Sequence, residues 1–576
     1  MPGTEPPMTR RRPPPFFLAA PVAMALAACG DDGGPPQEAT GTSGTGTDTE
    51  GPDASGTTTE NGEDTTTAAD STGGEIEPPP PLPWTDECTF GGSDLSRLDP
   101  DLQCAGIEVP LDWDDLGSES LVIAAYKLPT TAETRRGQLW LLDGGPGSSG
   151  LGLVGRTELT MPLREAGWDV LVPAHRGTLP GLDCPSIPIL PECRTALERQ
   201  WGEGLRHFNS SQAAHDLAHL VERERQIPDD PVVVYGVSYG TMWGMHYASL
   251  HPDQPDGLVL DSVLPSEVEV LTEEEEQQIS ADVLMQRCID DPDCGVTLPH
   301  ADGAEFSTSV VAAIDEDDCG PPDGGQWVDA PFRTQLGALL NGSRRDYVPL
   351  MSALLAACTP ETTALYWAAI PQLLSFSPSS AAPLDGGPLF GVPPEGYDVD
   401  PTLYFSTELQ YVVMGTTVLR DEEDPTPYTS EAEGNLVGLG FADTFHDVHD
   451  VWTTLPDVAL LPPYPAELPT LTLAGRFDQQ TPLGWALQTP SLEAGGSRSL
   501  LVFDAANHGV IFSGVTEAGE PCARDIMLEF AAQPTTKLDL SCMDDVPDVD
   551  PTLQRPDLQD LSIMVFGTDD PWSLVP

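Results

Sequence analysis

Short apolar runs recur along the chain from residue 121 onward, and most carry apolar side chains at every position. Strands that are apolar on both faces are typical of a parallel sheet covered by helices on both sides. Amphipathic stretches between several runs, such as residues 212–224, predict helices. The pattern therefore predicts an α/β fold with a mostly parallel central sheet. The runs lie at residues 121–126, 138–142, 168–172, 231–235, 257–261, 470–474 and 499–503.

Residues 266–440 interrupt this alternation. They contain Leu- and Ala-rich helical stretches separated by loops rich in Pro and Gly. A mainly helical cap inserted between two parts of one sheet explains the change of pattern. We therefore expect a core formed by residues 84–265 and 441–576, with the cap inserted between its two parts.

The first 83 residues predict an export signal followed by a tether. Three arginines at 10–12 precede a short apolar run at 16–28 that ends in small residues, as a secretory signal does. The sequence LAAC at 26–29 resembles a bacterial lipobox, which makes residues 1–28 a lipoprotein signal and Cys29 the lipidated N-terminus. An ordinary signal peptide with an incidental cysteine is the alternative. The predicted location is the bacterial cell envelope, at the outer membrane or cell surface, with the lipid as the membrane contact.

Residues 29–83 consist mostly of Gly, Thr, Ser, Asp, Glu and Pro. A segment with so few large apolar side chains cannot bury enough surface to offset the conformational entropy that it would lose on folding. We therefore expect a disordered acidic linker.

Eleven cysteines agree with export. Without Cys29 an even set of ten remains, which in an exported chain predicts five disulfides. Ten cysteines allow roughly 900 pairings, and we predict that neighbours along the sequence pair with each other. The expected pairs are Cys88–Cys104, Cys184–Cys193, Cys288–Cys294, Cys319–Cys358 and Cys522–Cys542.

Composition narrows the class of protein. The chain has 576 residues, 25 Lys and Arg against 92 Asp and Glu, and a net charge of −67. Such acidity argues against nucleic-acid binding, which needs basic side chains to neutralise phosphates. With 39% apolar residues the chain can bury a sizeable core, so disorder of the whole chain is excluded.

The pentapeptide GVSYG at 236–240 directly follows the predicted strand 231–235 and precedes a predicted helix at 242–249. A G-x-S-x-G sequence between a strand and a helix is typical of a nucleophile elbow, so Ser238 is the predicted nucleophile. The following helix directs its N-terminus and the Tyr239 N–H at a developing oxyanion. A glycine-lined turn without catalytic function is the alternative.

A second glycine-rich segment, DGGPGSSG at 143–150, follows the predicted strand 138–142. Glycines let the backbone approach a substrate carbonyl closely, whereas Pro146 has no N–H to donate. We predict Gly145 as the second oxyanion donor; a flexible loop is the alternative.

Asp478 and His508 follow the predicted strands 470–474 and 499–503. An open α/β sheet binds its ligands at the carboxyl ends of its strands, and an acid and then a base are expected after the serine. We therefore predict that His508 accepts the Ser238 proton and that Asp478 orients His508.

Together these motifs resemble one branch of the α/β-hydrolases, the prolyl iminopeptidases and tripeptidyl aminopeptidases. The resemblance covers roughly residues 84–576, and Cys522 and Cys542 resemble the C-terminal segment of tripeptidyl aminopeptidase-like members. It implies a serine exopeptidase with Ser238, Asp478 and His508 as its triad, acting on peptides with free N-termini. The matching segments are GGPGSSG at 144–150, HRGT at 175–178, GVSYGT at 236–241, GRFDQQTP at 475–482 and NHG at 507–509.

An aminopeptidase must also bind the substrate ammonium, and a shielded carboxylate cluster is the physical means. The resemblance favours Glu422 and Glu423, with the acidic run 273–276 as the other candidate. Both could instead be solvated charges.

Other functions are open but weaker. His215 and His219 share a helical face at a zinc-protease spacing, and His446 and His449 form a second pair, but no third ligand is evident. We therefore expect no metal and no cofactor. A carboxylesterase would use the same triad, and a binding lipoprotein with a retained hydrolase fold is the non-catalytic alternative.

Overall fold

The computed structural model describes the greater part of the chain after residue 78. The described residues are 79–90, 93–178, 182, 184, 191–227, 229–265, 273–294, 298, 302–317, 331–375, 405–418, 434–439, 451–452, 463–488 and 498–576. Cys29, the signal peptide and nearly all of the linker lie outside this part. None of the helices in the described part is both long enough and apolar enough to cross a bilayer.

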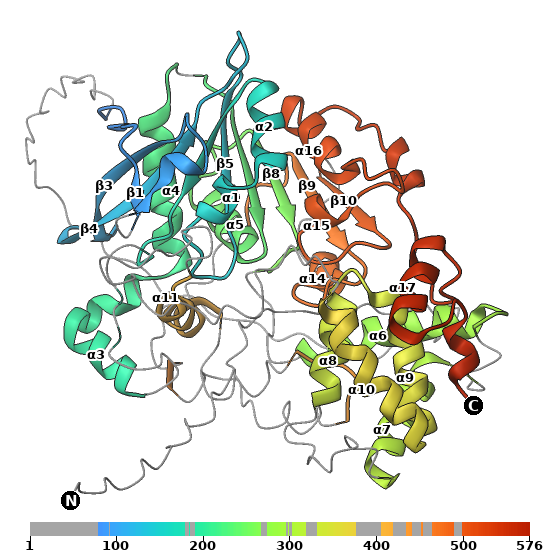
Figure 1. Cartoon of the computed structure of the whole chain (residues 1–576). Coiled ribbons are helices and arrows are strands. Elements are labelled where there is room, and N and C mark those ends of the chain that lie inside the picture. Colours follow the sequence, from blue (N-terminus) through green and yellow to red (C-terminus); the bar gives the residue numbers. More distant parts are fainter. Residues whose placement is uncertain are drawn as a thin grey trace, which may run out of the picture. The chain divides into compact units, whose positions relative to one another are not determined.

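A central sheet of eight strands, in the order β10-β9-β8-β7-β5-β6-β4-β3, runs through the described residues (Figure 1). Its strands from β10 to β6 are parallel, while β4 and β3 are antiparallel to their neighbours. Six of the seven predicted runs lie within one of these strands, and the run 231–235 begins one residue before β7. The strands are β3 Gln103–Asp112, β4 Asp115–Leu128, β5 Gly137–Leu142, β6 Trp168–Pro173, β7 Val232–Val237, β8 Gly257–Asp261, β9 Thr470–Gly475 and β10 Arg498–Phe503.

The strands are apolar at successive positions because both faces of the sheet are covered. In β7, Val232 and Val234 belong to one core cluster, whereas Val233 and Tyr235 belong to the other. The first cluster contains side chains of α4 (Ser210–Glu224) and α5 (Tyr239–Leu250). The second contains side chains of α2 (Thr157–Glu165), α15 (Val510–Ser513) and α16 (Cys522–Ala532). The predicted α/β fold is confirmed.

The edge strand β3 is an element that the apolar runs did not predict. Ile107, Val109 and Leu111 are buried, and Glu108 between the first two is exposed. An edge strand with one solvated face alternates instead of forming a continuous run, and this alternation is the signal that could have revealed it.

The segment predicted as a cap is helical wherever the structure describes it at length. It contains α6 (Glu273–Asp290), α7 (Gly303–Asp317), α8 (Pro331–Asn341), α9 (Val348–Ala357), α10 (Pro360–Ser375) and α11 (Thr407–Val413). Helices α6 to α10 contribute to a third core cluster. The C-terminal helix α17 (Pro556–Phe566) contributes to this cluster too and lies beside α10 (Figure 1). The C-terminal segment thus packs in the helical cluster, although its sequence follows the last strand.

Among the described residues, four disulfides join neighbouring cysteines, as expected from their order in the sequence. They are Cys88–Cys104, Cys184–Cys193, Cys288–Cys294 and Cys522–Cys542. Cys358 is also disulfide-bonded, and its expected partner, Cys319, lies outside the described residues. Several disulfides in one chain indicate an extracytoplasmic protein.

Candidate active site

Ser238 occupies a sharp turn between the end of β7 and the start of α5. Its backbone lies at φ 57° and ψ −128°, a region that non-glycine residues rarely adopt. The turn needs the flanking glycines. A Cβ on Gly236 would lie 2.2 Å from the Gly240 carbonyl oxygen, and one on Gly240 would lie 2.2 Å from the Leu142 carbonyl oxygen. These sterics leave the half-buried serine at the N-terminus of α5, as in a nucleophile elbow.

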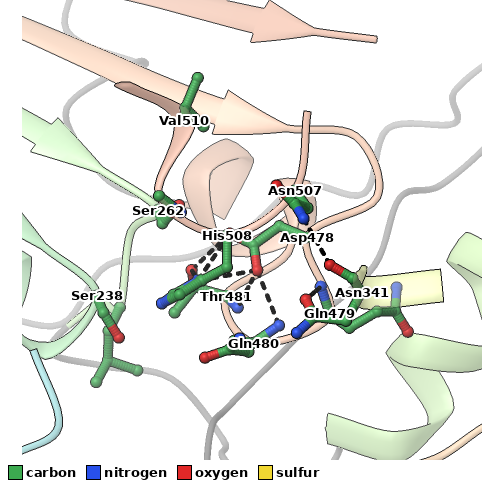
Figure 2. A network of polar contacts seen from close by, with 12 residues as sticks. Ser238, Ser262, Asn341, Asp478, Gln479, Gln480, Thr481, Asn507, His508 and Val510 are labelled. Atoms are coloured by element: carbon green, nitrogen blue, oxygen red, sulfur yellow. Dashed lines mark hydrogen bonds and ion pairs between the residues drawn. The ribbon is translucent and has the colours of Figure 1, made fainter. Parts of the chain in front are cut away.

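The structure brings Asp478 and His508 together at the ends of the adjacent strands β9 and β10. Nδ1 of His508 lies 3.0 Å and 3.1 Å from the two carboxylate oxygens of Asp478 (Figure 2). Asp478 is completely buried and accepts hydrogen bonds from the N–H groups of Gln480 and Thr481 and from the Thr481 hydroxyl. Sequence analysis missed Thr481, whose hydroxyl also lies 3.1 Å from Nδ1 of His508. These contacts hold the Asp478 carboxylate and the His508 ring in a fixed orientation relative to each other.

The charges of this pair stabilise each other. Burial alone would raise the pKa of Asp478, but the His508 charge and the hydrogen bonds from His508, Thr481 and Gln480 hold it below its usual value. Burial would likewise lower the pKa of His508, but Asp478, with a contribution from Asp261, raises it above its usual value. Asp478 therefore stays ionised and accepts from Nδ1, which leaves Nε2 to exchange a proton with another group.

Ser238 lies beside this pair but makes no hydrogen bond to His508 (Figure 2). Its backbone N–H donates to the Asp261 carbonyl oxygen at 3.0 Å, which ties the nucleophile turn to the end of β8. In serine hydrolases the serine–histidine contact is often long without substrate and shortens when substrate binds. The absence of this contact is therefore compatible with a catalytic triad that has no substrate bound.

The glycine loop after β5 lies against Ser238. A Cβ on Gly144 would lie 2.9 Å from Cβ and 3.3 Å from Oγ of Ser238. Gly145, at φ 118°, packs under the Phe405 ring, and the Ser406 N–H donates to the Gly147 carbonyl oxygen at 2.8 Å. Within the described part of the chain, the N–H groups of Gly145 and Tyr239 have no hydrogen-bond acceptor. Two backbone donors near the serine thus remain available for an oxyanion.

A family model described as alpha/beta hydrolase fold matches residues 139–289, the part that contains β5 to β8, the glycine loop and Ser238. The chain has the α/β-hydrolase fold.

Solved structures of this fold are similar to the chain at low identity. A lipase in its open form is 14% identical, with 72% of this chain and 96% of the lipase covered and a TM-score of 0.31. A thermostable carboxyl esterase from Bacillus coagulans is 14% identical (77% and 98% covered, TM-score 0.31). A proline iminopeptidase from Mycobacterium smegmatis is 16% identical (75% and 99% covered, TM-score 0.29). No curated protein sequence matches the chain.

The HRGT segment at residues 175–178 contacts the turn that contains Ser238 through the side chain of Tyr239. The buried Tyr239 hydroxyl lies 3.0 Å from Nε2 of His175 and 2.7 Å from Oγ of Ser210. Burial lowers the pKa of His175 to about 4, so the ring is neutral at neutral pH. Arg176 is fully buried and forms two hydrogen bonds with Asp216, at 2.8 Å and 2.6 Å. His175 and Ser210 therefore fix the side chain of Tyr239, the residue after Ser238.

The histidines considered as metal ligands form other contacts. Nδ1 of His215 lies 2.8 Å from Nε2 of His251, and the Trp113 ring packs against His215 and His219. Within the described ranges, no group of three or more His, Cys, Asp or Glu side chains is arranged to hold a metal ion. His446 and His449 lie outside those ranges.

The helical cluster holds the loop that carries the acid. Phe477, next to Asp478, is fully buried in that cluster, and the guanidinium groups of Arg287 and Arg345 lie over its ring. The Gln277 side chain donates to the Gln479 carbonyl oxygen at 3.0 Å, and Asn507 donates to the Asn341 carbonyl oxygen at 2.6 Å. The helices thus help to position both loops that follow β9 and β10. No local sequence signal indicates these contacts, because they join distant segments.

The residues expected to bind the substrate N-terminus are not placed by this geometry. Glu422 and Glu423 lie outside the described residues, as do the side chains of Glu273 and Glu274. Glu275 of the alternative acidic run is exposed to solvent.

Proposed function

We propose that the protein is a serine hydrolase with Ser238 as nucleophile, His508 as general base and acid, and Asp478 as the residue that orients His508. The observation that carries this proposal is the hydrogen-bonded pair of the buried Asp478 and the half-buried His508, beside a serine held in a strained strand-to-helix turn. The N–H groups of Gly145 and Tyr239, which have no acceptor in the described part of the chain, supply the oxyanion donors that such a hydrolase needs.

The geometry supports a two-stage acyl transfer. Oγ of Ser238 attacks the substrate carbonyl carbon while Nε2 of His508 takes its proton. The Gly145 and Tyr239 N–H groups stabilise the resulting oxyanion. As the intermediate collapses, the leaving group departs with the proton from His508. Water then attacks the acyl-enzyme, with His508 as base, and releases the acid and free Ser238. These steps need no metal and no cofactor.

We propose peptides with free N-termini as substrates, so that the enzyme is an aminopeptidase. The sequence resemblance to prolyl iminopeptidases and tripeptidyl aminopeptidases supports this choice. The net charge of −67 supports it independently, because a strongly acidic protein raises the local concentration of cationic N-termini. We assign the ammonium contact to Glu422 and Glu423.

A panel of peptide anilides with free N-termini, assayed beside their N-acetylated counterparts and simple alkyl esters, tests the substrate class. We expect the free peptides to be cleaved with kcat/KM at least about tenfold above the acetylated ones, since a shielded ion pair contributes about 1.4 kcal/mol or more to transition-state binding. Equal turnover of free and blocked peptides would contradict the aminopeptidase proposal. Turnover of the esters alone would favour the carboxylesterase, which shares all of the described machinery.

We also propose that the mature enzyme is attached to the cell envelope through a lipid on Cys29. The disulfides support an extracytoplasmic location. Replacing Cys29 by serine in the full chain is expected to move the protein from the membrane fraction to the soluble fraction, because one anchoring group is lost. A Cys29→Ser protein that stays with the membrane would contradict lipid attachment at this residue.

A further inference from the structure

The carboxyl end of β8 carries two polar residues that the proposed triad does not use. Asp261 and Ser262 are both completely buried, and Ser262 has a left-handed backbone at φ 59°. A buried carboxylate is costly unless it is paired or well hydrogen-bonded. Its partners therefore indicate what it does in the fold.

Besides the hydroxyl groups of Tyr235 and Ser262, the partners of the Asp261 carboxylate are backbone N–H groups of residues that closely follow His508. The Asp261 carboxylate accepts from Val510 at 2.7 Å and from Ile511 at 3.1 Å. The Ser262 hydroxyl accepts from Gly509 at 2.9 Å (Figure 2 shows Ser262 and Val510 beside His508). Three consecutive N–H groups, which begin the short helix α15 and have no acceptor within it, are thus satisfied from β8.

The same strand end also holds the other catalytic loops. The Asp261 carbonyl oxygen accepts from the Ser238 N–H at 3.0 Å. The Ser262 N–H donates to the Leu473 carbonyl oxygen in β9, the strand that precedes Asp478, at 3.0 Å. The backbone of Asp261 therefore fixes the nucleophile, and its side chain fixes the segment after the base.

We propose that Asp261 is a positioning residue for the base: its carboxylate holds the His508 loop at a set distance from Ser238, and its negative charge stabilises the His508 imidazolium. This inference rests on the proposed function, because it assigns Asp261 a part in the same acyl transfer. Asp261 would then be a second buried carboxylate that acts on His508, through the backbone segment that follows the histidine.

Electrostatics agree with the geometry. Burial raises the pKa of Asp261 to about 6, although hydrogen bonds from Ile511, Val510 and Tyr235 and the charge of His508 favour its ionised form. The titratable groups that face it are Tyr235, whose hydroxyl donates at 2.9 Å, and His508. In turn, the Asp261 charge is one of the causes that raise the pKa of His508.

The sign of the expected change in pH dependence follows from this coupling. His508 must be neutral to act as a base, so activity falls as the pH decreases through its raised pKa. Removing the Asp261 charge lowers the pKa of His508, and the neutral base then persists to lower pH. A carboxylate with a purely structural function would not shift this limb of the profile.

Fluorophosphonate labelling of the full-length protein tests the inference without a choice of substrate, since the reagent reports activation of the serine alone. Asp261→Asn preserves the shape of the side chain but directs an amide NH2 at one of two backbone donors. We expect its second-order labelling rate to fall by about 10²-fold, as for a base displaced by about 1 Å. The acid limb of its pH profile, where the labelling rate falls as the pH decreases, should shift to lower pH.

Two further variants separate charge from structure. Ser262→Ala removes a neutral acceptor of the same loop, so labelling should slow by roughly five- to tenfold with the acid limb unchanged. Asp230→Asn is the matched control, because Asp230 is equally buried but binds Arg135 and Gln138 at the opposite end of β7. It should lower the melting temperature and leave both the labelling rate of folded protein and the acid limb unchanged.

The outcomes distinguish this inference from the proposed function. Absence of labelling in the wild-type protein would refute the serine-hydrolase proposal itself. If the wild type is labelled and Asp261→Asn is labelled at the same rate, the positioning role of Asp261 is overturned and the serine-hydrolase proposal stands. A slower Asp261→Asn variant whose acid limb does not move would also overturn it, because Asp261 would then be only a helix cap. If Asp261→Asn does not fold, a Ser262→Ala variant with an unchanged labelling rate overturns the positioning of the loop.

Discussion

Replacing Ser238 by alanine is expected to abolish fluorophosphonate labelling and to reduce turnover by on the order of 10⁶-fold. In the proposed mechanism Oγ of Ser238 forms the acyl-enzyme, and this atom lies at the end of β7 beside Gly144. The strained backbone of the turn depends on Gly236 and Gly240 and not on the serine hydroxyl. The variant should therefore fold, with a melting temperature close to that of the wild type.

Ser249→Ala supplies the control for this experiment. Ser249 lies at the far end of the same helix, α5, where its hydroxyl donates to the Met245 carbonyl oxygen. This variant should be labelled like the wild type. Continued labelling of Ser238→Ala would refute the nucleophile assignment. Inactivation of the wild-type protein by chelators would instead favour the metal site considered for the histidines.

Replacing Asp478 by asparagine is expected to lower kcat by on the order of 10⁴-fold. The carboxylate accepts from Nδ1 of His508, from two backbone N–H groups and from the Thr481 hydroxyl. An amide at this position directs an NH2 group at Nδ1 and stabilises the wrong tautomer of the ring. Because Asp478 also raises the pKa of His508, the residual activity should have its acid limb at lower pH than the wild type.

Asp504→Asn controls for a change of charge near the base. Asp504 lies on the same loop as His508, but its side chain is 55% exposed and its partners are Arg476 and Arg287. Exposed ion pairs of this kind contribute little to the free energy of unfolding, and solvent screens their charge. The kcat of this variant should therefore stay within about twofold of the wild-type value. An Asp478→Asn enzyme that retained kcat within tenfold of the wild type would show that another group orients His508.

Local chemistry explains why the fold class and the candidate triad could be recognised from the sequence. A strand covered on both faces is apolar at every position, as Val232 to Tyr235 are, and this needs no knowledge of its neighbours. The elbow is also local, because the close approach of Gly236 to Gly240 is set by the turn itself. β3 escaped recognition because an edge strand with one solvated face has no continuous apolar run.

Distant contacts within the site could not be recognised in the same way. Asp261 is a charged residue at the end of an apolar strand, yet the two N–H groups after His508 that donate to its carboxylate lie 249 and 250 residues away in the sequence. The support of Phe477 by Arg287 and Arg345 likewise joins the helical cluster to the acid loop.

The sequence by itself determined the strands that are covered on both faces, the alternation of strand and helix, and which residues have the chemistry of an acyl-transfer triad, since side-chain periodicity and glycine sterics act over a few residues. Only the tertiary structure decided how these residues are held. The strand order β10-β9-β8-β7 places the ends of four strands in one row. Through Asp261 and Ser262, this row joins Ser238 to the strand before Asp478 and to the segment after His508, and no local pattern encodes that connection.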